Sequence, residues 1–290
     1  MTDKFVLTLS CPDRAGLVAE VSGMLASAGC NITSSDQYSD ETQNGDGENC
    51  FFMRIAFSLA AATGNEQKLK TAISPLAKKF SMEWTLNNCD KPQRVLLMVS
   101  KFDHCLMDIL YRRARGALFM DVPAVISNHS DAYRLTASYD VPFHHWPVTK
   151  DAKAAQEAKL LTFIEEERID LIVLARYMQV LSQDICEKLS GKIINIHHSF
   201  LPSFKGAAPY KQAFTKGVKL IGATAHYVTA DLDEGPIIEQ NVARVNHAMS
   251  SNDLVTAGRD VERVTLAEAL KLHLEHRVLI NGQKTVVFKR

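Results

Sequence analysis

The chain lacks net charge, paired-cysteine motifs and long apolar runs. Its 33 Lys and Arg balance 33 Asp and Glu, so no overall field attracts nucleic acid or an anionic membrane. The six cysteines show no C-x-x-C spacing, which favours reduced thiols over a disulfide framework or a zinc site. A small molecule is therefore the expected partner.

The N-terminal segment lacks the features of a signal peptide. It reads "MTDKFVLTLSCPDRAG", without a basic stretch and a continuous apolar one, and no later run approaches the ~20 apolar residues of a membrane span. We therefore expect a cytoplasmic protein. With 290 residues, 46% of them hydrophobic and 23% charged, the chain is typical of a globular protein with two domains.

The first 87 residues predict one small domain. Their patterns alternate as strand, helix, strand, strand, helix, strand, with Asp13 as a candidate cap of the first helix and a polar linker between the middle strands. This ferredoxin-like βαββαβ order predicts a four-stranded antiparallel sheet with two helices on one face. Because such a sheet leaves edge strands open, we expect pairing with a second copy and hence a homo-oligomer.

A polar linker over 88–93 separates this domain from a second one over 94–290. The apolar runs "RVLLMVS" and "IDLIVLARY" are typical of strands buried on both faces, and helical patterns lie between the strands. The alternation predicts an α/β fold with a doubly wound, mostly parallel sheet. Ligands of such sheets bind at the carboxyl ends of the strands.

The stretch "INIHHSFLP" (194–202) places polar side chains where one of these strands ends. Asn195 and His197 are two residues apart and should share one side of the strand, whereas His198 should face the other side, which makes a two-histidine metal site poor geometry. Asp233 follows in a loop closed by Gly-Pro, and one helix and one strand could return it to His197. Asn, His and Asp together suit acyl transfer. A structural histidine and a turn-forming aspartate explain the same spacing, so both interpretations stay open.

Two segments resemble the signature of the folate-dependent formyltransferase family. They are "NIHHSFLPSFKGAAPYKQA" and "HYVTADLDEGPII", which match Asn-x-His-x-Ser-x-Leu-Pro followed by Asp-x-Gly. The resemblance implies that Asn195, His197 and Asp233 are catalytic, that 10-formyltetrahydrofolate is the substrate, and that no metal or separate cofactor takes part. It also implies two loops against the pteridine ring, made of Met178, Gln179, Val180 and Leu181 and of Thr229, Ala230, Asp231 and Leu232. For His198 we expect a supporting role beside the catalytic residues.

The acceptor of the formyl group is inferred from departures within this family. Members that formylate glycinamide ribonucleotide hold its phosphate in a Gly-Ser-Asn turn, whereas the chain reads "SKFDHC" (100–105) there. Members that formylate tRNA carry a further basic domain, which is not expected after "HRVLINGQKTVVF". The remaining acceptor is water, which implies a hydrolase that supplies formate for purine synthesis and balances the folate pools. A formyltransferase with a small-molecule acceptor and a non-catalytic folate or amino-acid sensor remain alternatives.

The segment "CPDRAGLVAEVSGMLASAGCNI" is similar to ACT domains, which bind amino acids and regulate enzymes. The similarity implies an effector site at the turn formed by Asp13, Arg14, Ala15 and Gly16. Backbone amides at the helix start there could take a carboxylate. Glycine and methionine are the expected effectors. A domain that serves oligomerisation alone is the alternative.

Overall fold

The computed structural model describes residues 2–44, 48–60, 64–149, 153–201 and 209–289. The tip of the predicted hairpin (45–47) and residues 202–208 of the formyltransferase-like signature lie outside this part. The chain forms two compact units, namely Met1–Pro92 with Glu275–Asn281 and Val286–Arg290, and Gln93–Leu274 with Gly282–Thr285. The domain bounds of 1–87, 88–93 and 94–290 stay a prediction.

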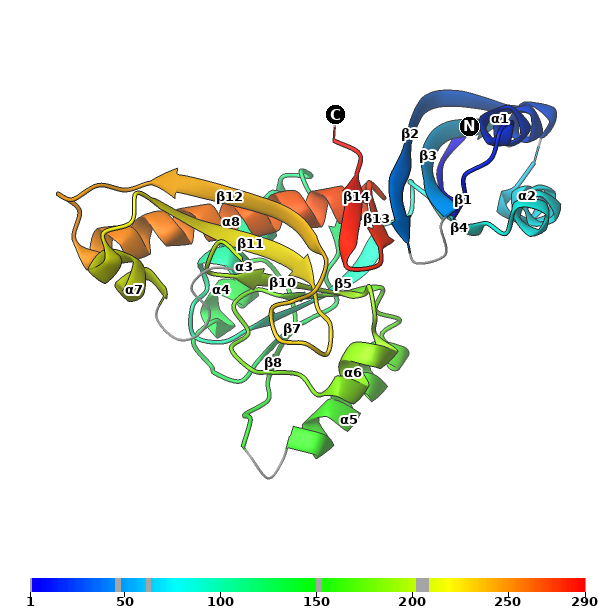
Figure 1. The fold of residues 1–290 in the computed structure, drawn as a ribbon. Coiled ribbons are helices and arrows are strands. Elements are labelled where there is room, and N and C mark those ends of the chain that lie inside the picture. Colours follow the sequence, from blue (N-terminus) through cyan, green and yellow to red (C-terminus); the bar gives the residue numbers. More distant parts are fainter. Residues whose placement is uncertain (1, 45–47, 61–63, 150–152, 202–208, 290) are drawn as a thin grey trace. The chain divides into compact units, whose positions relative to one another are not determined.

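The first unit contains a four-stranded antiparallel sheet in the order β2-β3-β1-β4. Alternate residues of β1, such as Phe5 and Leu7, are buried under the helices with Leu17 of α1 and Leu69 of α2. Both helices therefore cover one face (Figure 1). This arrangement confirms the predicted βαββαβ order. The elements are β1 (Thr2–Pro12), α1 (Leu17–Ser27), β2 (Cys30–Asn44), β3 (Glu48–Ala60), α2 (Glu66–Phe80) and β4 (Glu83–Asn88).

The turn between β1 and α1 differs from expectation in its capping. Gly16 is the N-cap of α1, with φ at 91° and no side-chain capping bond. Asp13 instead accepts a 2.5 Å hydrogen bond from Ser39 Oγ, so its prediction as the helix cap is wrong. The left-handed conformation at Gly16 places the N-cap three residues beyond Asp13, so the helix begins at Leu17. All four residues of the predicted effector turn are exposed.

A C-terminal segment also packs within the first unit. The Arg54 side chain on β3 is 5% exposed and donates hydrogen bonds to the backbone carbonyls of Glu275 and His276, at 3.0 to 3.3 Å. Asn281 Nδ2 donates to Asp40 Oδ2 at 2.7 Å. Residues 275–281 are thus fixed to the sheet by side chains of β2 and β3.

The second unit is built on an eight-stranded sheet in the order β12-β11-β10-β9-β5-β7-β8, with β6 beside β5. Strands β10, β9, β5, β7 and β8 run parallel, and β11 and β12 are antiparallel additions at one edge. This confirms the mostly parallel sheet. The strands are β5 (Gln93–Val99), β6 (Met120–Asp121), β7 (Val125–Ser127), β8 (Phe143–His145), β9 (Leu171–Leu174), β10 (Ile193–His197), β11 (Leu220–Tyr227) and β12 (Ile237–Arg244). A separate pair consists of β13 (Val278–Asn281) and β14 (Lys284–Val287).

Helices bury both faces of this sheet. On β5, Leu96 and Met98 pack against α5 and α6, while Val95 and Leu97 are equally buried on the opposite face, where α8 contacts the sheet and α3. The helices are α3 (His104–Ala114), α4 (Tyr133–Ala137), α5 (Lys153–Glu166), α6 (Gln183–Lys188), α7 (Pro209–Lys216) and α8 (Ser251–Leu274). Among the described helices, none has the length and apolarity that a membrane crossing needs. The carboxyl ends of β5, β9 and β10 meet at one edge, which brings the loops after them together.

Candidate active site

Asn195 lies on β10 opposite His226 of β11. Asn195 Nδ2 is 3.2 Å from His226 Nε2, and His226 Nδ1 is 2.9 Å from the carbonyl oxygen of Tyr227. Because a carbonyl only accepts, His226 Nδ1 carries the hydrogen, and Nε2 of the neutral ring accepts from Asn195. His226 therefore orients the Asn195 amide, whose second N–H remains for another acceptor.

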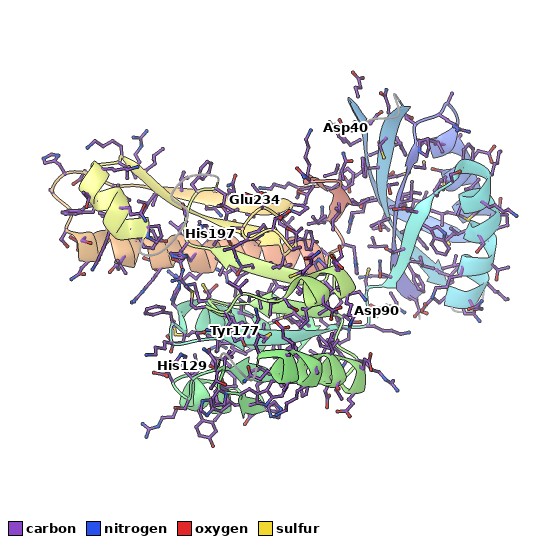
Figure 2. The ribbon with its side chains drawn as sticks, turned by 60° about the horizontal axis from the view of Figure 1, so that its bottom comes forward. Asp40, Asp90, His129, Tyr177, His197 and Glu234 are labelled. Carbon is purple, nitrogen blue, oxygen red and sulfur yellow. The ribbon has the colours of Figure 1, made fainter. Side chains whose placement is uncertain are left out.

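His197 meets Asp233 at the end of β10. Its Nδ1 is 3.1 Å from Asp233 Oδ2, and the other carboxylate oxygen is 3.7 Å from His226 Nε2. Figure 2 labels His197 beside Glu234, the neighbour of Asp233 on the loop after β11. The chain returns through α7 and β11, as the spacing predicted. Asn195, His197 and Asp233 are thereby brought together.

The loop that carries Asp233 turns back sharply. Asp233 itself has a left-handed backbone, with φ at 57°. A Cβ on Gly235 would lie 1.8 Å from the carbonyl oxygen of Tyr227, so only glycine fits there. Asp233 thus forms part of a tight turn and also contacts His197. The turn-forming interpretation therefore holds, and the catalytic role of Asp233 stays a prediction.

The charges of this trio are set by burial and hydrogen bonding. Burial alone would raise the pKa of Asp233, but the hydrogen bond from His197 and the charge of that ring hold the pKa well below its usual value. Asp233 is consequently a carboxylate at neutral pH. His197 Nε2 is buried and has no hydrogen-bond partner in the described part of the chain. When protonated, it can donate to a bound substrate.

His198 does not face away from His197. Strand β10 ends at His197, so side-chain alternation stops there, and the two rings lie side by side with centroids 5.3 Å apart. Both rings line the same cavity. The expectation of opposite faces is therefore wrong because it extended the strand by one residue. The segment after His198 is bound to β11, because the Thr224 hydroxyl donates a hydrogen bond to the carbonyl oxygen of Ser199 at 3.0 Å.

The environment of His198 predicts a pH effect on stability. Burial, followed by the charge of Arg176, lowers the pKa of His198 to about 4. The unfolded chain takes up this proton near pH ~6.5. His198 therefore costs folding free energy as the pH falls from that value towards 4, and His198→Asn should show a smaller decline in melting temperature between pH 7 and 4.5. The same substitution at exposed His247 is the control, and equal slopes for wild type and His198→Asn would contradict the assignment.

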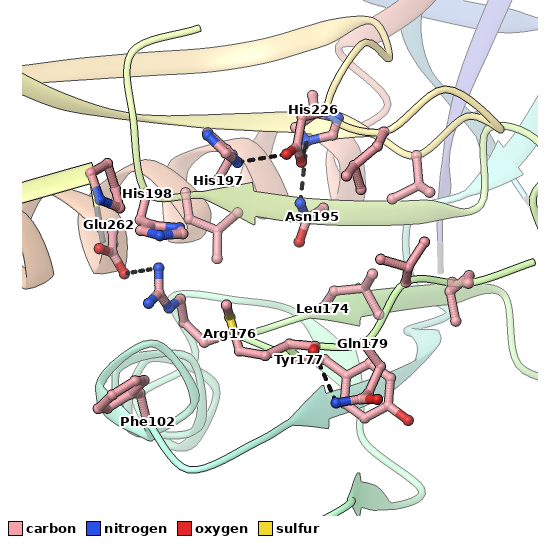
Figure 3. A pocket seen from close by; sticks show the side chains of 18 of the residues that line it. Phe102, Leu174, Arg176, Tyr177, Gln179, Asn195, His197, His198, His226 and Glu262 are labelled. Carbon is pink, nitrogen blue, oxygen red and sulfur yellow. Dashed lines mark hydrogen bonds and ion pairs between the residues drawn. The ribbon is translucent and has the colours of Figure 1, made fainter. Parts of the chain in front are cut away.

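A cavity of about 640 Å³ joins the trio to the two predicted folate loops (Figure 3). All eight residues of those loops line it, which are Met178, Gln179, Val180, Leu181, Thr229, Ala230, Asp231 and Leu232. Met178, Val180 and Leu232 are each more than half exposed although they are apolar. Apolar side chains gathered at a cavity mouth provide a surface that a flat ring can cover.

One wall of the cavity was not predicted from the sequence. Glu262 of α8 is 1% exposed and accepts from Tyr210 Oη at 2.7 Å and from His104 Nε2 at 2.8 Å. Arg176 Nη1 lies 3.4 Å from the same carboxylate. Two weak signals in the sequence indicate this wall. Arg176 interrupts the apolar run "IDLIVLARY", and Glu262 lies on the buried face of a helix with Gly258 and Leu266.

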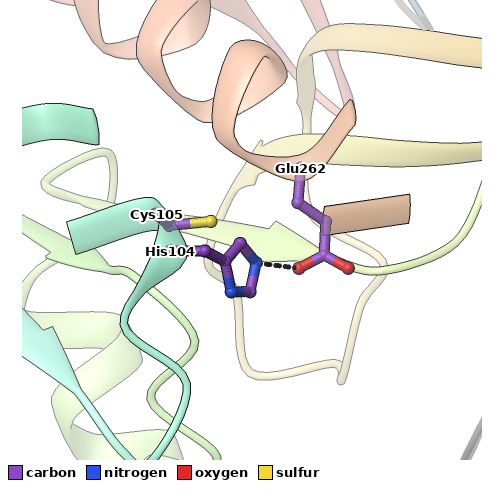
Figure 4. A group of neighbouring side chains, drawn as sticks. All are labelled: His104, Cys105 and Glu262. Carbon is purple, nitrogen blue, oxygen red and sulfur yellow. Dashed lines mark hydrogen bonds and ion pairs between the residues drawn. The ribbon is translucent and has the colours of Figure 1, made fainter. Parts of the chain in front are cut away.

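His104, Cys105 and Glu262 place three potential metal ligands within 4.8 Å of one another (Figure 4). Burial raises the pKa of Cys105 well above its usual value, which disfavours the thiolate that a metal needs. Arg176 and the hydrogen bond from His104 outweigh burial and lower the pKa of Glu262. The arrangement favours a hydrogen-bonded carboxylate paired with arginine over a cation site.

Comparisons with known proteins agree with this geometry. Residues 93–270 match the Formyl transferase family, and residues 5–70 match the ACT domain. The formyltetrahydrofolate deformylase of Bacillus subtilis is 46% identical over 99% of this chain and 94% of its own length. The chain belongs to the formyltetrahydrofolate deformylase family. This confirms the predicted pairing of an ACT domain with a formyltransferase-like enzyme domain.

Solved structures separate the deformylase family from its transferase relatives. The formyltetrahydrofolate deformylase of Burkholderia mallei has a TM-score of 0.93 and 48% identity, covering 99% of this chain and 100% of that one. The glycinamide ribonucleotide transformylase of Symbiobacterium toebii has a TM-score of 0.64 and 31% identity, covering 68% of this chain and 95% of that one. The transferase therefore matches only part of the chain.

Proposed function

We propose that the chain hydrolyses 10-formyltetrahydrofolate to formate and tetrahydrofolate in the cytoplasm, without a metal or a resident cofactor. The observation that carries the proposal is the 3.1 Å contact of His197 with Asp233 beside Asn195, in a cavity that the folate loops share. Relatives that match nearly the whole chain are formyltetrahydrofolate deformylases, which supports this substrate. The formate would supply purine synthesis.

Asn195 and protonated His197 act on the formyl oxygen. The free N–H of the Asn195 amide and the N–H of His197 Nε2 both donate to this oxygen. As water adds to the formyl carbon, negative charge develops on the oxygen, and these hydrogen bonds strengthen. The neutral partner His226 keeps the amide in position without competing for the charge.

Asp233 holds His197 and handles the protons of water. Its low pKa makes it a weak base towards free water, so its first role is to orient the nucleophile and to stabilise the imidazolium. Proton transfer to the carboxylate becomes favourable once the water oxygen bonds to carbon and its proton turns acidic. The proton then passes to N10 as the C–N bond breaks, which releases formate and tetrahydrofolate.

The folate loops fix the substrate against these residues. Apolar Met178, Val180 and Leu232 cover the faces of the pteridine ring, while backbone groups of Thr229 to Asp233 pair with its donor and acceptor edge. Burying the ring removes apolar surface from water and leaves the formyl group in place for attack.

Incubation of the protein with 10-formyltetrahydrofolate alone tests the proposal. A hydrolase releases formate and tetrahydrofolate in equal amounts without any acceptor. A strict transferase, of the kind that the transformylase relatives represent, releases neither until an acceptor is added. A folate or amino-acid sensor binds the substrate without turnover.

We also propose that the enzyme is a homo-oligomer and that its ACT domain regulates the hydrolysis. Glycine or methionine binds at the Asp13–Gly16 turn and should change the rate or the KM on the order of fivefold, the usual scale of allosteric coupling. Gly16→Ala should reduce this response, because alanine is strained at a φ of 91°. The added Cβ would meet no atom within 4 Å, so the substitution acts through the backbone and not through a steric clash. Gly23→Ala, with equally open surroundings but no positive φ, is the control. Titration of both amino acids without any change in rate would remove the regulatory role.

A further inference from the structure

Side chains in mutual contact form one wall of the catalytic cavity beside His197 and His198. Glu262 is held from three sides by Tyr210, His104 and Arg176. The ring of His198 lies against those of His197 and Tyr210, with centroids 5.3 and 6.3 Å apart. This wall therefore reaches from the catalytic histidine to α8 without a break.

The wall is tightly filled. A Cβ on Gly258 would lie 2.1 Å from the Tyr210 ring, so only glycine at this position of α8 leaves room for the tyrosine. Two guanidinium groups lie near the Phe102 ring, that of Arg176 at 5.7 Å and that of Arg259 at 5.3 Å from its centroid. These side chains bound the catalytic cavity on the side of His198.

Arg176 combines a strained backbone with buried donors that lack hydrogen bonds. Its φ is 66°, a left-handed value that costs a side-chain-bearing residue energy. It is 8% exposed, and within the described part of the chain its Nε and Nη1 make no hydrogen bond, so the ion pair with Glu262 is imperfect. Its backbone is fixed because Ser100 N donates to its carbonyl at 3.2 Å. Strain and unsatisfied donors at a cavity wall indicate a functional constraint more than a stabilising one.

We infer that Arg176 is the residue that excludes amine acceptors and reserves the formyl group for water. The inference rests on the proposed hydrolysis. Arg176 lines the catalytic cavity on the side of His198, whose ring neighbours that of His197 (Figure 3). It also neutralises Glu262, whose carboxylate would otherwise attract an amine N–H. It acts on specificity and takes no part in the chemistry at the formyl carbon.

Removing Arg176 should therefore admit an amine. The nitrogen of a primary amine attacks the formyl carbon, the bond from carbon to N10 breaks, and one amine proton moves to N10. The products are an N-formyl amine and tetrahydrofolate, so atoms and charge balance without another reactant. Arg176→Gly suits this test because glycine accepts a φ of 66° and leaves Glu262 beside the opened space.

The experiment incubates each protein with 10-formyltetrahydrofolate and glycinamide, and measures N-formylglycinamide and formate by mass spectrometry. We expect Arg176→Gly to raise the ratio of formylated amine to formate at least tenfold over wild type. Adding Glu262→Gln to this variant should lower that ratio, because the carboxylate that attracts the amine is lost. Arg168→Gly is the matched control, since exposed Arg168 also has a positive φ but does not line the cavity.

Arg176→Asn guards against a folding defect, because asparagine also tolerates a left-handed backbone. A product ratio within twofold of wild type, or loss of both reactions, in whichever of the two variants is folded by circular dichroism overturns the inference. Formate release by wild type in the same assay reports separately on the proposed hydrolysis. A wild type that releases no formate contradicts the proposed function instead.

Discussion

Alanine at His197 is expected to lower the turnover of 10-formyltetrahydrofolate about 10²–10³-fold, and alanine at Asn195 should have a similar effect, because each removes one donor to the developing oxyanion. Both side chains sit in the cavity with fixed partners, Asp233 for His197 and His226 for Asn195. Single-turnover measurement of formate release isolates the chemical step. The loss should fall on kcat more than on KM.

His198→Ala is the neighbouring control for this prediction. His198 lines the same cavity, but its pKa of about 4 leaves it neutral at physiological pH, so it contributes no positive charge to the oxyanion. We expect a loss below about tenfold, since a neutral group at the wall affects positioning more than charge. Equal losses for His197→Ala and His198→Ala would contradict the assignment of His197 as the donor.

Asparagine at Asp233 should lower kcat about 10²–10⁴-fold, the range for loss of a general acid–base group. The substitution keeps the size of the side chain but removes the anion that pairs with His197 Nδ1 and faces His226 Nε2. The KM should change little, because the apolar loops that hold the ring remain intact. Steady-state kinetics over a range of folate concentrations separates the two constants.

Glu234→Gln is the control for Asp233→Asn. It removes the same charge from the next residue of the loop, which is exposed. A similar loss of kcat in both variants would mean that the overall charge of the loop matters and not the Asp233 carboxylate. A loss confined to Asp233→Asn supports the proposed role in proton handling.

Much of the architecture follows from local patterns. Strand β5 was predictable because a strand buried on both faces reads as one continuous apolar run. The first unit was predictable because its helices and strands differ in hydrophobic period. Asn195 and His197 share a side because their spacing of two residues lies within β10.

The errors and omissions have equally local causes. His198 was misplaced because the end of a strand cannot be read from the sequence to within one residue, and alternation fails beyond that end. Asp13 was misassigned because the left-handed turn at Gly16 delays the helix. Arg176 and Glu262 are far apart in the chain, and only the packing of α8 against the sheet makes them partners.

Isotope labelling tests the central claim, that water accepts the formyl group at the site of Asn195, His197 and Asp233. The reaction is run in H₂¹⁸O with no amine present, and formate and tetrahydrofolate are quantified together. The account predicts one ¹⁸O atom in each formate released, equal amounts of the two products, and a slow reaction with Asp233→Asn. Unlabelled formate, or tetrahydrofolate that forms only when an amine acceptor is added, would contradict it.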